Sequence, residues 1–252
     1  MDTFSESLKS WRQARRFSQL DLALEAEVSS RHISFLETGR ARPSREMIGK
    51  LGEALQLPLD AQNQLLYHAG FAPRYTARSW DNVAMAPIRQ AIMHTLSQHA
   101  PYPAIAVDRL WSIVRMNDPA RMLYGQFGLA EGSSLLDLML SDFLPPLIEN
   151  WPAVAHHSAR RLRTESAAQG GVPELEAAAM HLSKVPAPQG FETGPVVPTI
   201  LKTGTMRLSM FATIAQFGTP EDITLDALKI ELFFPADSET DALLRAMASA
   251  GG

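Results

Sequence analysis

The chain has 252 residues, of which 46% are hydrophobic and 20% charged, and its net charge is −4. This composition is that of a globular protein with one or two domains, and it excludes a disordered or collagen-like chain. The sequence contains no cysteine, which excludes disulfide bonds and thiolate metal sites.

Five short helices are predicted before residue 70. The first runs from about Thr3 to Arg15, with apolar residues at helical spacing. Ser18, Ser29 and Ser44 each precede an amphipathic run and are typical N-caps of the next three helices. A fifth helix ends near His68. The spacing therefore predicts a small all-α domain over residues 1–74.

Within this domain, residues 15–45 form a capped helix, a tight turn, a second capped helix and a basic loop, which is the layout of a helix-turn-helix. Residues 8–57 resemble the helix-turn-helix of the XRE family. The resemblance rests on Arg12, Ser18-Gln19-Leu20-Asp21-Leu22-Ala23, Val28-Ser29, Ile33, Glu37-Thr38-Gly39-Arg40 and Pro43-Ser44. One departure is Glu27, which stands where the family usually has glycine. A positive φ at this residue costs roughly 1 kcal/mol.

The start of the second capped helix is predicted to contact DNA bases. Arg31 can donate two hydrogen bonds to a guanine. Phe35, one turn later, either packs on a thymine methyl or belongs to the core. Arg40 and Arg42 are expected to reach phosphates, and the resemblance implies the same for Gln19. The predicted DNA-binding residues are Gln19, Ser29, Ser30, Arg31, Ser34, Phe35, Arg40 and Arg42. The resemblance also implies that Arg12 and Glu37 form a structural ion pair.

Residues 75–252 are predicted to form a second domain of mixed helices and strands. The predicted helices cover residues 87–99, 118–124, 134–148, 151–168, 173–184 and 240–247. Two hairpins, 104–107 with 111–116 and 196–202 with 205–217, and a strand at 228–234 complete the pattern, and residues 185–195 are predicted to be a loop. We expect an α+β chain in which an antiparallel sheet carries helices on one face.

This second part resembles the MmyB-like ligand-binding domain. The matching signatures are Pro101-Tyr102-Pro103-Ala104, residues 111–117, Asn150-Trp151, Leu162-Arg163 and residues 217–237. The resemblance implies a PAS-like fold that holds a small hydrophobic molecule such as a fatty acid. The candidate ligand-binding residues are Ile113, Met122, Phe143, Trp151, Phe211, Ile214 and Phe217, with Arg160 and Arg163 for a carboxylate. For each apolar residue the alternative is ordinary core packing, and for each arginine it is a solvated surface.

The sequence favours a DNA-binding transcription regulator, cytoplasmic and homodimeric, whose second domain senses a fatty-acid-like ligand. The alternative is a DNA-binding module whose second domain serves dimerisation or a protein partner. An enzyme is less favoured, because the motifs G-x-S-x-G, H-E-x-x-H, the Walker loop and G-x-G-x-x-G are all absent, and no catalytic residue is predicted. No cofactor is expected apart from a bound fatty acid. No metal is expected, since the adjacent His156 and His157 point about 100° apart on a helix. No secretory signal or membrane span is predicted.

Overall fold

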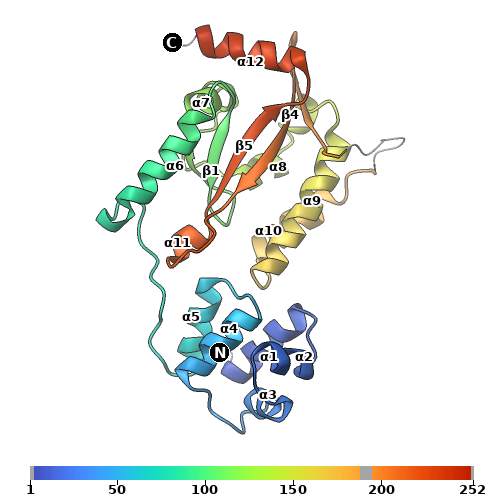
Figure 1. Cartoon of the computed structure of the whole chain (residues 1–252). Coiled ribbons are helices and arrows are strands. Elements are labelled where there is room, and N and C mark those ends of the chain that lie inside the picture. Colours follow the sequence, from blue (N-terminus) through green and yellow to red (C-terminus); the bar gives the residue numbers. More distant parts are fainter. Residues whose placement is uncertain (1–2, 188–194, 251–252) are drawn as a thin grey trace. The chain divides into compact units, whose positions relative to one another are not determined.

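The computed structural model describes residues 3–187 and 195–250 (Figure 1). The predicted loop at residues 185–195 thus lies mostly outside the described residues. Contacts divide the chain into two compact units. Unit 1 contains residues 1–78, 165–172 and 219–226, and unit 2 contains residues 79–164, 173–218 and 227–252. Two short segments of the second half of the sequence therefore belong to the same unit as the N-terminal helices.

Unit 1 is built on five N-terminal helices, as the sequence predicts. These are α1 (Phe4–Ala14), α2 (Gln19–Glu25), α3 (Ser30–Glu37), α4 (Arg45–Ala54) and α5 (Leu59–His68), and a one-turn helix, α11 (Ile223–Asp226), joins them. Ser18, Ser29 and Ser44 each cap a helix by accepting a hydrogen bond from a backbone amide of its first turn. Apolar residues from all five helices form one core, whose centre includes Leu8, Leu22, Ile33, Leu36, Leu51 and Leu65.

The turn between α2 and α3 has the predicted backbone strain. Glu27 has a φ of 55°, in the left-handed region that normally favours glycine. Its amide donates to the carbonyl of Leu24, and the next amide, of Val28, donates to Ala23. The turn therefore keeps the geometry that the helix-turn-helix needs, at an energetic cost that a glycine would avoid.

Unit 2 is an α+β unit with a five-stranded antiparallel sheet. Its strands are β1 (Ala104–Val107), β2 (Ile113–Met116), β3 (Thr199–Thr203), β4 (Met206–Ala215) and β5 (Lys229–Pro235), in the order β2-β1-β5-β4-β3. Its helices are η1 (Val83–Met85), α6 (Ala86–Gln98), α7 (Asp118–Gly125), α8 (Leu135–Leu140), η2 (Pro145–Leu147), α9 (Trp151–Ala168), α10 (Pro173–Leu182) and α12 (Ser238–Ala250), and the last turn of α9 belongs to unit 1.

The sheet has two differently lined faces, and helices pack on both of them. One face, which we call face A, carries Ala104, Ala106 and Ile230 and packs against Ile92 and Leu96 of α6. The opposite face, face B, carries residues that pack against α7 and, through its partly buried Trp151 and Val154, α9. The expectation that helices cover a single face is thus wrong (Figure 1). The strand order explains this, because β1 and β5 are interior strands with apolar side chains on both sides.

One predicted helix is interrupted. Residues 134–148 form α8 and the short η2 rather than a single helix. Pro145 and Pro146 lack amide hydrogens, and proline restricts the residue before it, so a continuous helix cannot form there.

Candidate nucleic-acid interface and ligand face

The first turn of α3 presents its polar side chains to solvent. Ser29 Oγ accepts a hydrogen bond of 3.2 Å from the amide of His32, which fixes the start of the helix. Ser30 and Arg31 are exposed, while Ile33 and Leu36 on the opposite side are buried in the core of unit 1. The helix therefore offers its N-terminal residues outward, as a helix that enters a major groove must.

Arg31 and Phe35 form a pair on this outer surface. The Arg31 guanidinium carbon lies 5.2 Å from the centroid of the Phe35 ring, a distance that permits a cation–π interaction. Phe35 is half-buried, so core packing does not take up its whole side chain, and part of the ring remains available for the predicted contact with a thymine methyl. The ring holds the guanidinium close to the helix while leaving its donors free to reach a base edge.

Behind α3, Arg12 and Glu37 form a bidentate ion pair. Arg12 Nε donates to Glu37 Oε1 at 2.6 Å, and Nη2 donates to Oε2 at 2.9 Å. Gln19 Nε2 donates to the same Oε2 at 2.8 Å, and Arg12 Nη1 donates to the carbonyl of Phe17 at 2.7 Å. The Glu37 side chain is only 2% exposed. This network ties α1, α2 and the end of α3 together, and it fixes the Gln19 side chain at the start of α2.

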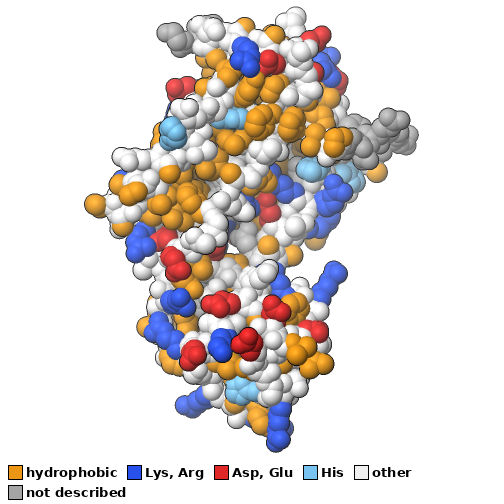
Figure 2. Space-filling view, in the orientation of Figure 1, with side chains coloured by type: hydrophobic (Ala, Val, Ile, Leu, Met, Phe, Trp, Pro, Cys, Tyr) orange, Lys and Arg blue, Asp and Glu red, His pale blue; other side chains and the backbone are white. Residues whose placement is uncertain are grey.

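Basic residues around α3 divide into two groups. Arg40 and Arg42 are exposed in the loop after α3, and Figure 2 shows Lys and Arg side chains projecting around this end of unit 1. Arg15 forms the other group, because its guanidinium is already hydrogen-bonded within the protein. Its Nη1 and Nη2 donate to the carbonyls of Ala167 and Ala168 at 2.9 and 2.7 Å. Arg15 thereby caps the C-terminus of α9 and is not free to contact phosphate.

In unit 2, face B combines an exposed stretch with a buried charge cluster. Ile214 on β4 is 47% exposed, and its register partner on β5 is Glu231, which is 4% exposed. Arg161 of α9 forms an ion pair with Glu231, and its guanidinium also lies 4.3 Å from the Trp111 ring centroid. Burial, reinforced by the negative charge of Glu231, raises the pKa of the Tyr124 hydroxyl, which therefore stays neutral and able to donate.

Trp111 itself is strained. Its φ is 62°, an outlier for a bulky residue, and its side chain is buried. Such strain costs on the order of 1–3 kcal/mol and is concentrated at functional sites and ligand clamps. The strained tryptophan, the arginine above it and the glutamate on β5 thus form a compact charged cluster on face B.

The predicted ligand-binding residues do not form one site. Ile113 packs in the core of face B, and Trp151 packs against the same side from α9. Phe211 stacks on Phe234, and Phe217 packs with the α6 core, so both belong to face A. Only Ile214 lies beside the charge cluster.

The remaining candidates lie elsewhere. Phe143 is exposed and touches Phe127, with ring centroids 6.2 Å apart. Met122 lines an open surface pocket of about 310 Å³ between α6, α7 and the end of α12. Arg160 and Arg163 are exposed, and Arg163 donates to Ser183. The arginine that faces the sheet is therefore Arg161, which sequence reasoning missed.

A signal for this cluster exists in the sequence. The β5 segment KIELFFP places Lys229 and Glu231 on one face of an otherwise apolar strand. Both side chains are buried in the structure. A buried carboxylate needs a charged or hydrogen-bonding partner, so a glutamate in an apolar strand indicates that an arginine or lysine from another element packs against it.

The structure gives no sign that the adjacent His156 and His157 bind a metal together in the described part of the chain. His156 Nε2 is 2.8 Å from the carbonyl of Val185, and in the described residues no group of three potential metal ligands occurs. Among the same residues, no helix combines the length and apolar character that crossing a membrane requires.

Comparison with known proteins agrees with this division of the chain. Residues 88–247 match the family model described as "MmyB-like transcription regulator ligand binding domain", and residues 8–62 match the model "Helix-turn-helix". The chain is also similar to the "HTH-type transcriptional repressor RghR" of Bacillus subtilis (strain 168), with 38% identity over 72 residues. That alignment covers 28% of this chain and 51% of the relative, so the chain spans about half the length of the curated relative. These matches confirm both family resemblances drawn from the sequence.

Proposed function

Because the chain belongs to the MmyB-like transcription regulators and carries a helix-turn-helix, we propose that it reads an operator through α3 and senses a small hydrophobic ligand in unit 2. The observation that carries the DNA-binding half is the outward first turn of α3, where Arg31 packs on Phe35. Arg31 reads a base, and Ser30, Ser34 and Phe35 complete the reading surface. Gln19, Ser29, Arg40 and Arg42 contact the backbone.

The DNA-binding proposal is tested by comparing two arginine substitutions on an operator selected from random duplexes. Arg31→Ala should cost about 1–3 kcal/mol and relax preference at one base pair, because a base contact is lost. Arg40→Ala should weaken all sequences alike and flatten the salt dependence. Lys202→Ala, which removes a charge from unit 2, serves as the control. Unchanged selectivity in Arg31→Ala would assign the reading surface to another element.

The ligand proposal rests on face B. Its exposed stretch at Ile214 offers apolar contact, and the adjoining Arg161–Glu231 pair offers charge, a combination that suits an acyl chain with a polar head group. Arg161 replaces Arg160 and Arg163 as the cation in this proposal. The alternative occupant is a protein partner or a second copy of the chain, with no small molecule.

Operator titrations with delipidated protein decide between these occupants. Saturated fatty acids of about twelve to eighteen carbons, a range set by the size of typical ligand sites, should shift operator affinity by ~1–3 kcal/mol. Arg161→Met should weaken fatty-acid binding, whereas Arg163→Met, which removes an exposed arginine, should not. If the operator affinity with each fatty acid equals that of the delipidated protein alone, the partner-binding alternative is favoured.

We further propose that the protein binds its operator as a homodimer. A single helix-turn-helix buries too little DNA surface for high specificity, and two-fold operators match two-fold proteins. Sedimentation of the full chain with and without the selected operator should give a dimer on DNA. One protein chain per operator would contradict this.

A further inference from the structure

The loop between β4 and β5 is part of the DNA-binding unit. Strands β4 and β5 are neighbours in the sheet of unit 2, and Ile214 and Glu231 are register partners on face B. Of the residues that connect these strands, 216–228, the segment 219–226 nevertheless belongs to unit 1. The chain thus leaves the ligand-sensing sheet, becomes part of unit 1, and returns to the sheet at Lys229.

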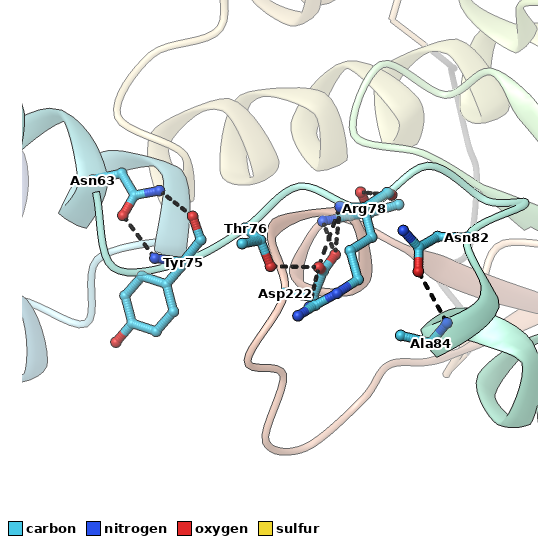
Figure 3. A network of polar contacts seen from close by, with 8 residues as sticks. Asn63, Tyr75, Thr76, Arg78, Asn82, Ala84 and Asp222 are labelled. Carbon is cyan, nitrogen blue, oxygen red and sulfur yellow. Dashed lines mark hydrogen bonds and ion pairs between the residues drawn. The ribbon is translucent and has the colours of Figure 1, made fainter. Parts of the chain in front are cut away.

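Asp222 anchors this loop. Its carboxylate accepts hydrogen bonds from Arg78 Nη1 at 2.9 Å, the Arg78 amide at 3.2 Å, Thr76 Oγ1 at 3.3 Å and the Thr224 amide at 2.9 Å (Figure 3). The residue is 3% exposed. A buried carboxylate with so many donors is costly to displace, because removing it leaves the Arg78 side chain and several amides without their acceptor.

Further hydrogen bonds join the same loop to α5 and to residues 74–78, the segment after α5 that we call the connector. The Ile223 amide donates to the carbonyl of Thr76 at 2.9 Å, and Thr224 Oγ1 donates to the carbonyl of Arg78 at 2.8 Å. Asp226 accepts a hydrogen bond of 2.9 Å from the amide of Leu59, the first residue of α5. The loop therefore contacts α5 directly as well as through the connector.

Asn63 extends the network into α5. Its Oδ1 accepts from the Tyr75 amide at 3.0 Å, and its Nδ2 donates to the Tyr75 carbonyl at 2.7 Å (Figure 3). The same Oδ1 also accepts from the Arg74 amide at 2.9 Å. Hydrogen bonds thus tie α5 to Arg74 and Tyr75, and the peptide bond from Tyr75 to Thr76 joins them to the residues that hold Asp222. Lys229, the first residue of β5, follows Asp226 by three residues.

We propose that Asp222 is the positioning residue through which the state of face B alters operator binding. This proposal rests on the ligand-sensing function of face B. A shift of β5 relative to β4 moves the loop that joins them, and the Asp222 contacts pass that movement to the connector and α5. Coupling of this kind travels through contiguous contacts, and the hydrogen bonds of Asp222 supply the part of that path that lies within unit 1.

A ligand-free experiment tests the transmission itself. Ile214→Glu places a second carboxylate opposite Glu231 and alters face B without any ligand. Operator affinity of the full chain is measured for this substitution with Asp222 intact and with Asp222→Ala. We expect a change of at least about 5-fold, the lower end of typical coupling, with Asp222 intact, and almost none with Asp222→Ala.

Two matched variants control for folding and for added charge. Thr213→Glu adds the same charge on the neighbouring exposed residue, which faces the opposite side of the sheet, and should leave operator affinity unchanged. Asp237→Ala removes another carboxylate that accepts from a helix amide, at Thr240, and should leave the Ile214→Glu effect intact. Circular dichroism confirms that each variant is folded.

The outcomes separate this proposal from the ligand proposal. The role of Asp222 is overturned if Ile214→Glu changes operator affinity equally with Asp222 and with Asp222→Ala, or if it changes the affinity in neither case. An equal change would assign the transmission to another contact, such as that of Arg15 with the end of α9. The same titrations with palmitate then test the ligand. If palmitate leaves wild-type operator affinity unchanged while the Ile214→Glu effect depends on Asp222, the fatty-acid proposal fails and the transmission stands.

Discussion

Glu37→Ala is expected to lower the free energy of unfolding by about 3–5 kcal/mol, since breaking a buried ion pair strands the remaining charge. The substitution leaves the Arg12 guanidinium, which is 11% exposed, without its bidentate acceptor. It also removes the acceptor of Gln19, and thus a contact that holds α2 to α3. Urea unfolding of the full chain measures the loss. A change below about 1 kcal/mol, the range of exposed pairs, would contradict the role assigned to this pair.

The same carboxylate gives the stability of unit 1 a defined pH dependence. Burial raises the pKa of Glu37, but the hydrogen bonds from Arg12 and Gln19 lower it further, so the net pKa lies below its ordinary value. A lowered carboxylate pKa stabilises the folded state above the unfolded pKa and loses that contribution as pH falls through the folded value. Acid unfolding should therefore begin at higher pH in Glu37→Gln, which keeps the size of the side chain but not its charge.

The helix-turn-helix was predictable because its determinants are local. Ser18, Ser29 and Ser44 cap the helices that follow them, and the apolar spacing marks the buried side of each. Even the positive φ of Glu27 followed from its place in the turn. Each of these features depends on residues within one or two helical turns, which a sequence displays directly.

The second unit was predictable only in part, because its determinants are long-range. Strand positions and the α9 range follow from composition and periodicity, and the antiparallel sheet is as expected. Which side of the sheet each helix covers depends on strand order, which no local pattern encodes. The one-turn helix α11 was missed, since a turn held by Asp222, Thr76 and Arg78 depends on residues far apart in the chain.

The arginine of α9 that pairs with Glu231 could not be predicted from the sequence for the same reason. Residues 160, 161 and 163 lie on one helix, and successive residues differ by about 100° in direction. Arg161 is partly buried and pairs with Glu231, whereas Arg160 and Arg163 are exposed. A one-residue difference therefore decides which guanidinium reaches Glu231, and only the position of β5 resolves it.

Glu231→Ala is expected to be as damaging in unit 2 as Glu37→Ala is in unit 1. The carboxylate pairs with Arg161, which is 20% exposed at its side chain, and Lys229 lies buried two residues earlier on the same face of β5. Removing this carboxylate takes away the ion-pair partner of the Arg161 guanidinium, and it removes a negative charge from the face of β5 that also carries buried Lys229. The free energy of unfolding should fall by about 3–5 kcal/mol, as for other broken buried pairs. Chemical denaturation of the full chain measures it.

The chain supplies its own control for burial. Arg207 and Glu149 form an ion pair at 3.2 Å whose side chains are 44% and 41% exposed. Glu149→Ala should therefore cost no more than about 1 kcal/mol, because water already solvates both partners. The combined Arg161→Met and Glu231→Leu substitution should cost less than the sum of the two single changes, since groups in direct contact are not additive. If Glu231→Ala and Glu149→Ala lower the free energy of unfolding equally, burial of the Arg161–Glu231 pair has no energetic consequence. The proposal that face B has a buried charged centre would then be wrong.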